Sequence, residues 1–140
     1  MRKLLIAAAF APAALFLTAA APAQDILDQL ADKASELFKE KGLSPTGWVS
    51  NGGLAEGGQK TVSVTLKGGS VYSVVGMCDG DCGDLNLRVT DSSGNVIGED
   101  LKDDDFPLIV TDKSGTFQAT VSMVKCKVSQ CRYRLMAFSQ

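Results

Sequence analysis

Apolar residues recur at every second position in much of the chain beyond Thr46. A strand that covers a core with one face and meets water with the other has this pattern. The clearest runs of this kind lie at 61–66, 85–90, 117–123 and 133–137. The run 71–77 is apolar on both faces apart from Ser73, which predicts a strand in the middle of a sheet.

Glycine-rich turn sequences separate these runs, at 52–53, 57–58, 68–69, 93–95 and 114–115. About eight short strands joined by such turns predict an all-β fold, an antiparallel β-sandwich of the jelly-roll kind. The segment 51–58 is rich in glycine, and we expect a mobile loop there.

One segment, 25–41, has helical rather than alternating spacing. Its apolar stripe consists of Leu27, Leu30, Ala34, Leu37 and Phe38. Asp25 is suited to cap the first turn and Gly42 to end the last one, and Pro45 prevents continuation. We expect this amphipathic helix to pack on the sandwich or cap one end of it. Docking onto a partner or a membrane surface is the alternative.

The N-terminus has the pattern of a targeting segment. Two basic residues, Arg2 and Lys3, precede an apolar run from Leu4 to Leu17, and Ala21-Pro22-Ala23 offers a small-x-small cleavage site. The pattern predicts a signal peptide at 1–23, a helix at 24–45 and a β-sandwich domain at 46–140. An uncleaved membrane anchor is the alternative. Cleavage would leave no stable membrane span and a periplasmic or secreted protein.

The charge of the chain argues against two kinds of partner. Without Arg2 and Lys3, twelve basic residues are set against sixteen acidic ones, and no basic run is present. Phosphate backbones and anionic lipids are bound by clustered Lys and Arg, so we expect neither nucleic acid nor an anionic membrane as the partner.

The four cysteines form two close pairs, Cys78 with Cys82 and Cys126 with Cys131. In an oxidising compartment such pairs become disulfides, and four cysteines allow three connectivities. We favour the two local bridges, each of which would contribute about 2 kcal/mol by loop entropy. A four-thiolate zinc site is the alternative, but its usual two-residue spacing is absent.

Several short motifs follow one another in a fixed order. They are Gly58-Gln59-Lys60 before Val62 and Val64, then Gly69-x-x-Tyr72, Asp84-Leu85-Asn86-Leu87 and Gly115-Thr116-Phe117. From Gly57 onward this order resembles the bacterial pre-peptidase C-terminal domain, with Asn86 as a departure from that family's pattern. The resemblance implies a secreted β-sandwich. The cysteine pairs are similar to those of stand-alone secreted versions of that domain.

The composition removes several catalytic mechanisms. The chain has no histidine, so it has no histidine base, no Ser-His or Cys-His pair and no histidine metal ligand. Two carboxylates could in principle hydrolyse glycosides. The acidic residues here lie in Gly- and Asp-rich turns, however, where exposure gives them none of the desolvation that catalysis needs. We therefore expect no enzyme.

Acidic residues gather in two loops. The first contains Asp79, Asp81 and Asp84, and the second contains Asp103, Asp104 and Asp105. Calcium binds several carboxylate and carbonyl oxygens on such loops, so these six residues are candidate calcium ligands. The alternative is that the aspartates form turns by bonding their own backbone. If the two loops meet in space, their mutual repulsion favours a bound cation.

Three aromatic residues, Trp48, Tyr72 and Tyr133, are candidates for contacting a ligand such as a sugar. The alternative is that they lie in the core. We expect Arg132 and Arg134 to pair with the acidic loops. The sequence as a whole predicts an exported binding or structural module for a protein or envelope component. A carbohydrate-binding module is the alternative.

Overall fold

The structure is a computed structural model that describes residues 23–140. The predicted signal peptide lies outside the described residues apart from Ala23. One helix precedes eight strands: α1 (Ile26–Glu40), β1 (Ser44–Leu54), β2 (Gln59–Leu66), β3 (Tyr72–Cys78), β4 (Cys82–Thr90), β5 (Val96–Asp100), β6 (Leu108–Thr111), β7 (Gly115–Cys126) and β8 (Cys131–Ser139). Among these residues, no helix is both long enough and apolar enough to cross a membrane.

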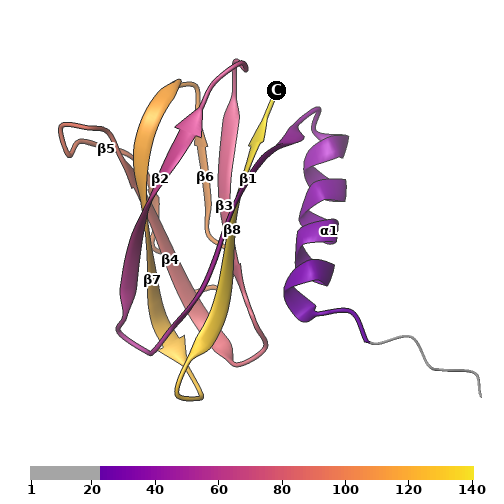
Figure 1. Cartoon of the computed structure of the whole chain (residues 1–140), viewed down its shortest axis with the longest axis vertical. Helices are drawn as coiled ribbons and strands as arrows, with labels where there is room; N and C mark the ends of the chain where they lie inside the picture. The colour runs from indigo at the N-terminus through magenta and orange to yellow at the C-terminus, as the bar shows by residue number, and fades with distance from the viewer. Residues whose placement is uncertain (1–22) are drawn as a thin grey trace, which may run out of the picture.

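The strands form two antiparallel four-stranded sheets that face each other (Figure 1). The strand order is β1-β8-β3-β6 in one sheet and β2-β7-β4-β5 in the other, which is jelly-roll order. The predicted all-β sandwich with one N-terminal helix is therefore confirmed. We call the first sheet the helix-side sheet and the second the open sheet.

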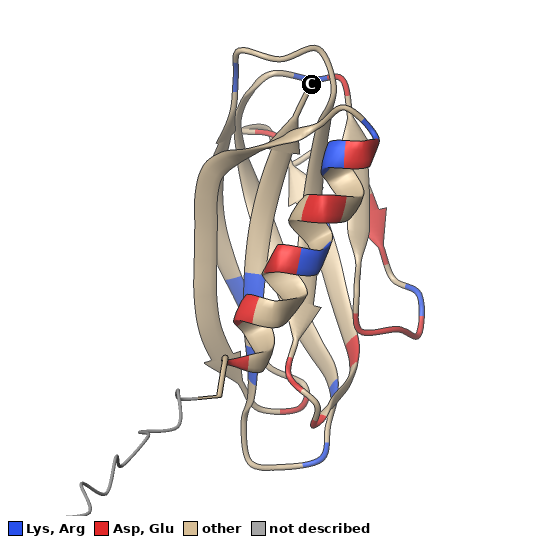
Figure 2. Ribbon diagram, turned by 90° about the vertical axis from the view of Figure 1, so that its right-hand side faces the viewer, with Lys and Arg blue, Asp and Glu red and all other residues tan. Residues whose placement is uncertain are grey.

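Helix α1 lies against the outer face of the helix-side sheet (Figures 1 and 2). Its buried side chains are Leu27, Ala31, Ala34 and Phe38. The Phe38 ring stacks on the Phe138 ring of β8, with the ring centroids 4.4 Å apart. The Asp25 carboxylate accepts a hydrogen bond from the Leu27 backbone N–H and so caps the first turn. The helix packs on the sandwich as predicted, but Ala31 is buried in the stripe whereas Leu37 is about half exposed.

The core has two layers because the helix-side sheet is covered on both faces. Alternating residues of the two sheets meet between them, whereas Val75, Met77, Met136 and Phe138 face the helix. Every residue of β3 is buried, and β3 lies between β8 and β6. The prediction of a central strand at 71–77 is confirmed.

The prediction of a mobile loop at 51–58 is wrong for its first half. Residues 51–54 belong to β1, where Asn51 pairs with Arg134 and Gly52 with Tyr133. The turn is confined to the residues after Leu54. The sequence misleads here because a glycine pair is typical of a turn, whereas Gly52 serves to make room for the Tyr133 ring.

Candidate functional site

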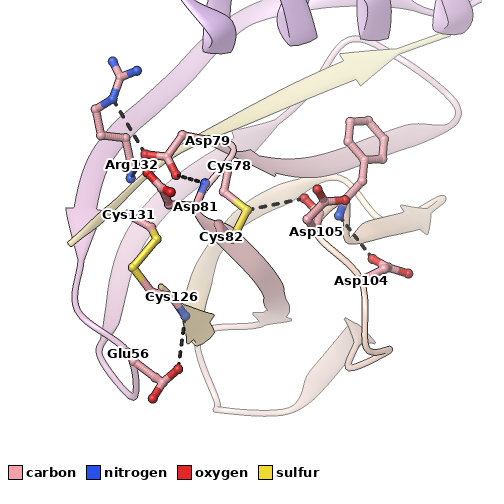
Figure 3. The surroundings of a disulfide bond; sticks show 11 residues. Glu56, Cys78, Asp79, Asp81, Cys82, Asp104, Asp105, Cys126, Cys131 and Arg132 are labelled. Atoms are coloured by element: carbon pink, nitrogen blue, oxygen red, sulfur yellow. Dashed lines mark hydrogen bonds and ion pairs between the residues drawn. A yellow bond between two sulfur atoms is a disulfide. The ribbon is translucent and has the colours of Figure 1, made fainter. Parts of the chain in front are cut away.

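Both predicted disulfides are present as the local pairs. Cys78–Cys82 joins the end of β3 to the start of β4, and Cys126–Cys131 joins β7 to β8. Cys82 and Cys126 are paired positions on β4 and β7, so the two bridges lie at the same end of the sandwich (Figure 3). No free cysteine remains among the described residues.

The first acidic loop is held by its own hydrogen bonds. The Asp79 carboxylate accepts one bond from the Asp81 backbone N–H and a 2.8 Å bond from the Arg132 backbone N–H (Figure 3). The Asp81 side chain is exposed. The Asp81 backbone carbonyl oxygen accepts a hydrogen bond from the Lys127 backbone N–H. Asp79 therefore acts here as a turn-forming residue that fastens the loop to β8.

The second acidic loop meets Asp84. The Asp84 side chain is 94% buried, and its Oδ1 atom has no hydrogen-bond partner. Burial, and next the negative charge of Asp103, raise the pKa of the Asp84 carboxyl. Asp103 in turn accepts bonds of 2.8 and 2.9 Å from the Lys125 ammonium group. Of the three aspartates predicted in the first loop, only Asp84, which lies on β4, approaches the second loop, and Lys125 supplies positive charge near both Asp84 and Asp103.

The remaining members of the second loop have structural contacts. The Asp104 carboxylate accepts a hydrogen bond from the Phe106 backbone N–H. The Asp104 backbone carbonyl oxygen accepts one from the Leu85 backbone N–H. The exposed Asp105 places its carbonyl oxygen 3.7 Å from Cys78 Sγ (Figure 3). Within residues 23–140, no group of three or more acidic or cysteine side chains is arranged to hold a metal ion. Calcium binding stays a prediction.

The candidate aromatic ligand contacts lie mostly in the core. Tyr72 is fully buried, and its hydroxyl group bonds to the backbone of Gly69. Tyr133 is 97% buried, and burial raises its pKa. Trp48 is partly exposed, and its indole N–H donates to the Ser63 carbonyl oxygen on edge strand β2. Tyr72 and Tyr133 are therefore core residues, the alternative given for them, whereas ligand contact by Trp48 stays a prediction.

The two arginines of β8 anchor the helix. Arg132 donates to the Asp25 carboxylate at 2.7 Å, and Arg134 donates to Asp28 at 2.9 Å. Arg132 also approaches Asp79 at 3.9 Å (Figure 3). The predicted pairing with the acidic loops is thus correct only for Arg132 with Asp79. The main partners of the two arginines are acidic residues at the start of α1. The sequence did not predict this pairing, because the position of the helix on the sheet is decided by tertiary packing.

A separate candidate surface is the outer face of the open sheet. In the part of the chain that the structure describes, no helix covers this face (Figure 1). It contains a hollow of about 510 Å³, lined mainly by outward-facing side chains of β2, β7 and β4 and by Leu101. Its polar lining includes Gln59, Thr61, Asn86, Arg88, Thr120 and Ser122.

The hollow is nearly free of charge. Among the described residues that line it, Arg88 alone is charged, and its guanidinium group pairs with the Glu99 carboxylate at 2.9 Å. Sequence alternation alone does not predict this surface, because the polar face of an alternating strand is normally expected to be solvated. The signal was present: the outward positions of 59–65 and 116–122 carry hydroxyl and amide groups rather than charges.

No known protein family matches this chain, and no curated protein does either. The resemblance to the pre-peptidase C-terminal domain therefore stays a hypothesis.

Proposed function

We propose that this protein is an exported, non-catalytic binding module that recognises a protein or an envelope component through the outer face of the open sheet. One observation carries the proposal. The two sheets differ: α1 packs on the outer face of one, whereas nothing within residues 23–140 covers the outer face of the other, whose hollow has a single charged lining residue, Arg88. A surface that served only solubility would carry interspersed charges.

The chemistry of the chain supports a non-catalytic role. The sequence has no histidine, and the cysteines are joined in disulfides. Asp84 and Asp103 are two neighbouring carboxyl groups, and the pKa of Asp84 is raised. Neither of them lines the hollow, however, and Asp84 is enclosed by protein. A hydrolytic pair must reach its substrate, so these residues favour a structural role.

Export is supported by the two disulfides and by the leader pattern. Mass spectrometry of the protein recovered from its native host tests it directly. We expect an N-terminus at Gln24 and no free thiols. An intact leader with reduced cysteines would contradict export.

Calcium as a stabilising ion remains part of the proposal for the acidic loops. The Lys125 ammonium group forms an ion pair with the Asp103 carboxylate, so a calcium ion that binds Asp103 would have to displace the lysine. Thermal unfolding in calcium and in a chelator tests this point, and a Lys125→Ala variant should strengthen any response. An unchanged melting temperature in both proteins would eliminate the calcium proposal.

Co-sedimentation with envelope fragments from the producing cells tests the binding role. We expect the exported, oxidised protein to pellet with the fragments. Thr120→Glu, which places a charge in the hollow, should abolish pelleting. Ser129→Glu adds the same charge on an exposed loop away from the hollow and should leave pelleting unchanged. Equal behaviour of the two variants would refute the open face as the binding surface.

A further inference from the structure

We propose that the hollow on the open sheet binds an uncharged polysaccharide chain, which lies across rows of hydroxyl and amide side chains. This inference rests on the proposed function and names the chemistry of its ligand. Tyr72 and Tyr133 are buried in the core and take no part in this site.

The strand register arranges the polar side chains of the hollow in rows. Pairing across β2, β7 and β4 aligns Gln59 with Ser122 and Asn86, and it aligns Thr61 with Thr120 and Arg88. Neighbouring strands are about 4.8 Å apart, and successive outward residues on a strand are about 6.7 Å apart. The surface therefore repeats donors and acceptors at short, regular intervals, as a polymer of hydroxylated units does.

Hydroxyl groups suit a ligand that is itself hydroxylated. The Thr61 and Thr120 hydroxyl oxygens lie 2.8 Å apart, and each can act as donor or acceptor. A sugar hydroxyl group has the same dual capacity, so it can either donate a hydrogen bond to this pair of threonines or accept one from it. The Asn86 side chain also lines the hollow, and its Oδ1 atom has no hydrogen-bond partner. Rotation of this amide toward the hollow would let a ligand hydroxyl satisfy the oxygen.

The charge distribution selects against ionic ligands. Arg88 is neutralised by Glu99, so no unpaired charge among the described lining residues would attract a phosphate, a carboxylate or a cation. The chain as a whole is acidic, which further disfavours acidic polysaccharides. An uncharged glycan meets no such penalty, and it is the class of envelope component that the surface fits best.

One wall of the hollow is apolar. Leu101 follows β5, and its side chain is half exposed beside the polar rows. The C–H face of a sugar ring can pack against this side chain while its hydroxyl groups meet the strands. The volume of about 510 Å³ lies within the usual range of small-molecule sites, about 300–1,000 Å³. The hollow is therefore large enough for a short stretch of the chain.

The expected affinity is weak. The site offers several neutral hydrogen bonds and one apolar contact but no exposed aromatic ring among its lining residues, and such a site gives a Kd on the order of 1 mM. Native gel electrophoresis with polymer cast into the gel is sensitive in this range. We would use the exported, oxidised protein with galactomannan, amylose and dextran as uncharged probes and polygalacturonate as the acidic probe.

We expect at least one uncharged polymer to retard the protein and polygalacturonate to leave its mobility unchanged. Thr120→Val removes one hydroxyl group at nearly constant volume and should weaken retardation several-fold. Thr120→Glu should abolish it, and Ser129→Glu is the charge-matched control. Retardation by none of the uncharged polymers would overturn the inference, as would retardation that both Thr120 variants leave intact.

The two proposals fail in different ways. If protease treatment of the envelope fragments abolishes Thr120-dependent pelleting, the ligand is a protein. The glycan inference is then overturned, while the binding role of the open face stands. If pelleting survives protease treatment and remains sensitive to Thr120→Glu, the glycan inference is supported. Pelleting that never depends on Thr120 overturns both proposals.

Discussion

Gly52 and Tyr133 face each other across β1 and β8, and a methyl group on Gly52 would lie 2.5 Å from the Tyr133 hydroxyl oxygen. The Tyr133 ring therefore occupies the space that a side chain at position 52 would need. Strand β1 can close the edge of the helix-side sheet only because this position has no Cβ atom.

Gly52→Ala should lower the stability of the protein by about 1–3 kcal/mol, because the ring and the added methyl group compete for one space. Gly53→Ala is the matched control, since its nearest contact is the flexible Gln130 side chain at 3.4 Å. Thermal unfolding of both variants measures the difference. An equal change in the melting temperature of the two would contradict this account of Gly52.

Phe38→Ala should weaken the packing of α1 on the sheet. The Phe38 ring is 97% buried and stacks on Phe138, so truncation leaves a cavity that costs about 3–5 kcal/mol. Leu37, its neighbour in sequence, is about half exposed, and Leu37→Ala should have little effect. Amide hydrogen exchange provides the readout: protection should fall across residues 26–40 in Phe38→Ala and remain in Leu37→Ala.

The buried carboxylates Asp84 and Asp100 should respond to pH in opposite directions. The pKa of Asp84 is raised by burial and by the Asp103 charge, so its ionisation opposes folding. The folded state binds this proton more tightly than the unfolded state does. The contribution of Asp84 to stability is therefore most favourable at low pH, and it declines as pH rises from the unfolded value of about 3.9 through the raised pKa.

Asp84→Asn should consequently raise the melting temperature at pH 7, by about 4 °C for each 1 kcal/mol gained. The gain should shrink as pH falls toward 3.5, where the carboxyl group is mostly protonated in both states. Asp81→Asn changes an exposed aspartate of the neighbouring loop and serves as the control. A gain for Asp84→Asn that is the same at pH 3.5 and pH 7 would show that the removed charge is not its cause.

Asp100 is the opposite case. Burial by itself would raise its pKa, but hydrogen bonds from the Leu108 and Lys102 backbone N–H groups and the Lys102 charge lower the pKa overall. Its contribution is therefore present above the unfolded pKa and lost as pH falls through the folded one. Asp100→Asn should destabilise the protein at pH 7 by about 1.5–3 kcal/mol, the value of hydrogen bonds to a charged group. Thermal unfolding from pH 3 to pH 7 measures this loss, which should shrink toward pH 3.

Loss of either disulfide should lower stability by about 2 kcal/mol through the entropy of its short loop. The loss should be larger for Cys78→Ala with Cys82→Ala, because both of these side chains are buried, whereas Cys126 is only partly so. Thermal unfolding of the two double variants, with the oxidised native protein as the reference, tests the order. A larger loss for the Cys126 and Cys131 pair would contradict the argument from burial.

The sequence by itself determined the features that depend on neighbours along the chain. The alternating runs, the helix with its Asp25 cap and the two local disulfides follow from spacing within about fifteen residues, and the structure confirms each of them. The fully apolar run at 71–77 indicated a central strand, because only a strand covered on both faces tolerates that pattern.

The tertiary structure alone decided which residues meet across long separations. It placed the Tyr72 and Tyr133 rings in the core, paired Arg132 with Asp25, and paired Lys125 with Asp103. It also aligned Thr61 with Thr120, residues whose side chains bond across 59 positions of the sequence. Alternation shows which side chains share a face of one strand. The register between strands decides which of them form a site, and that register is fixed only when the whole core packs.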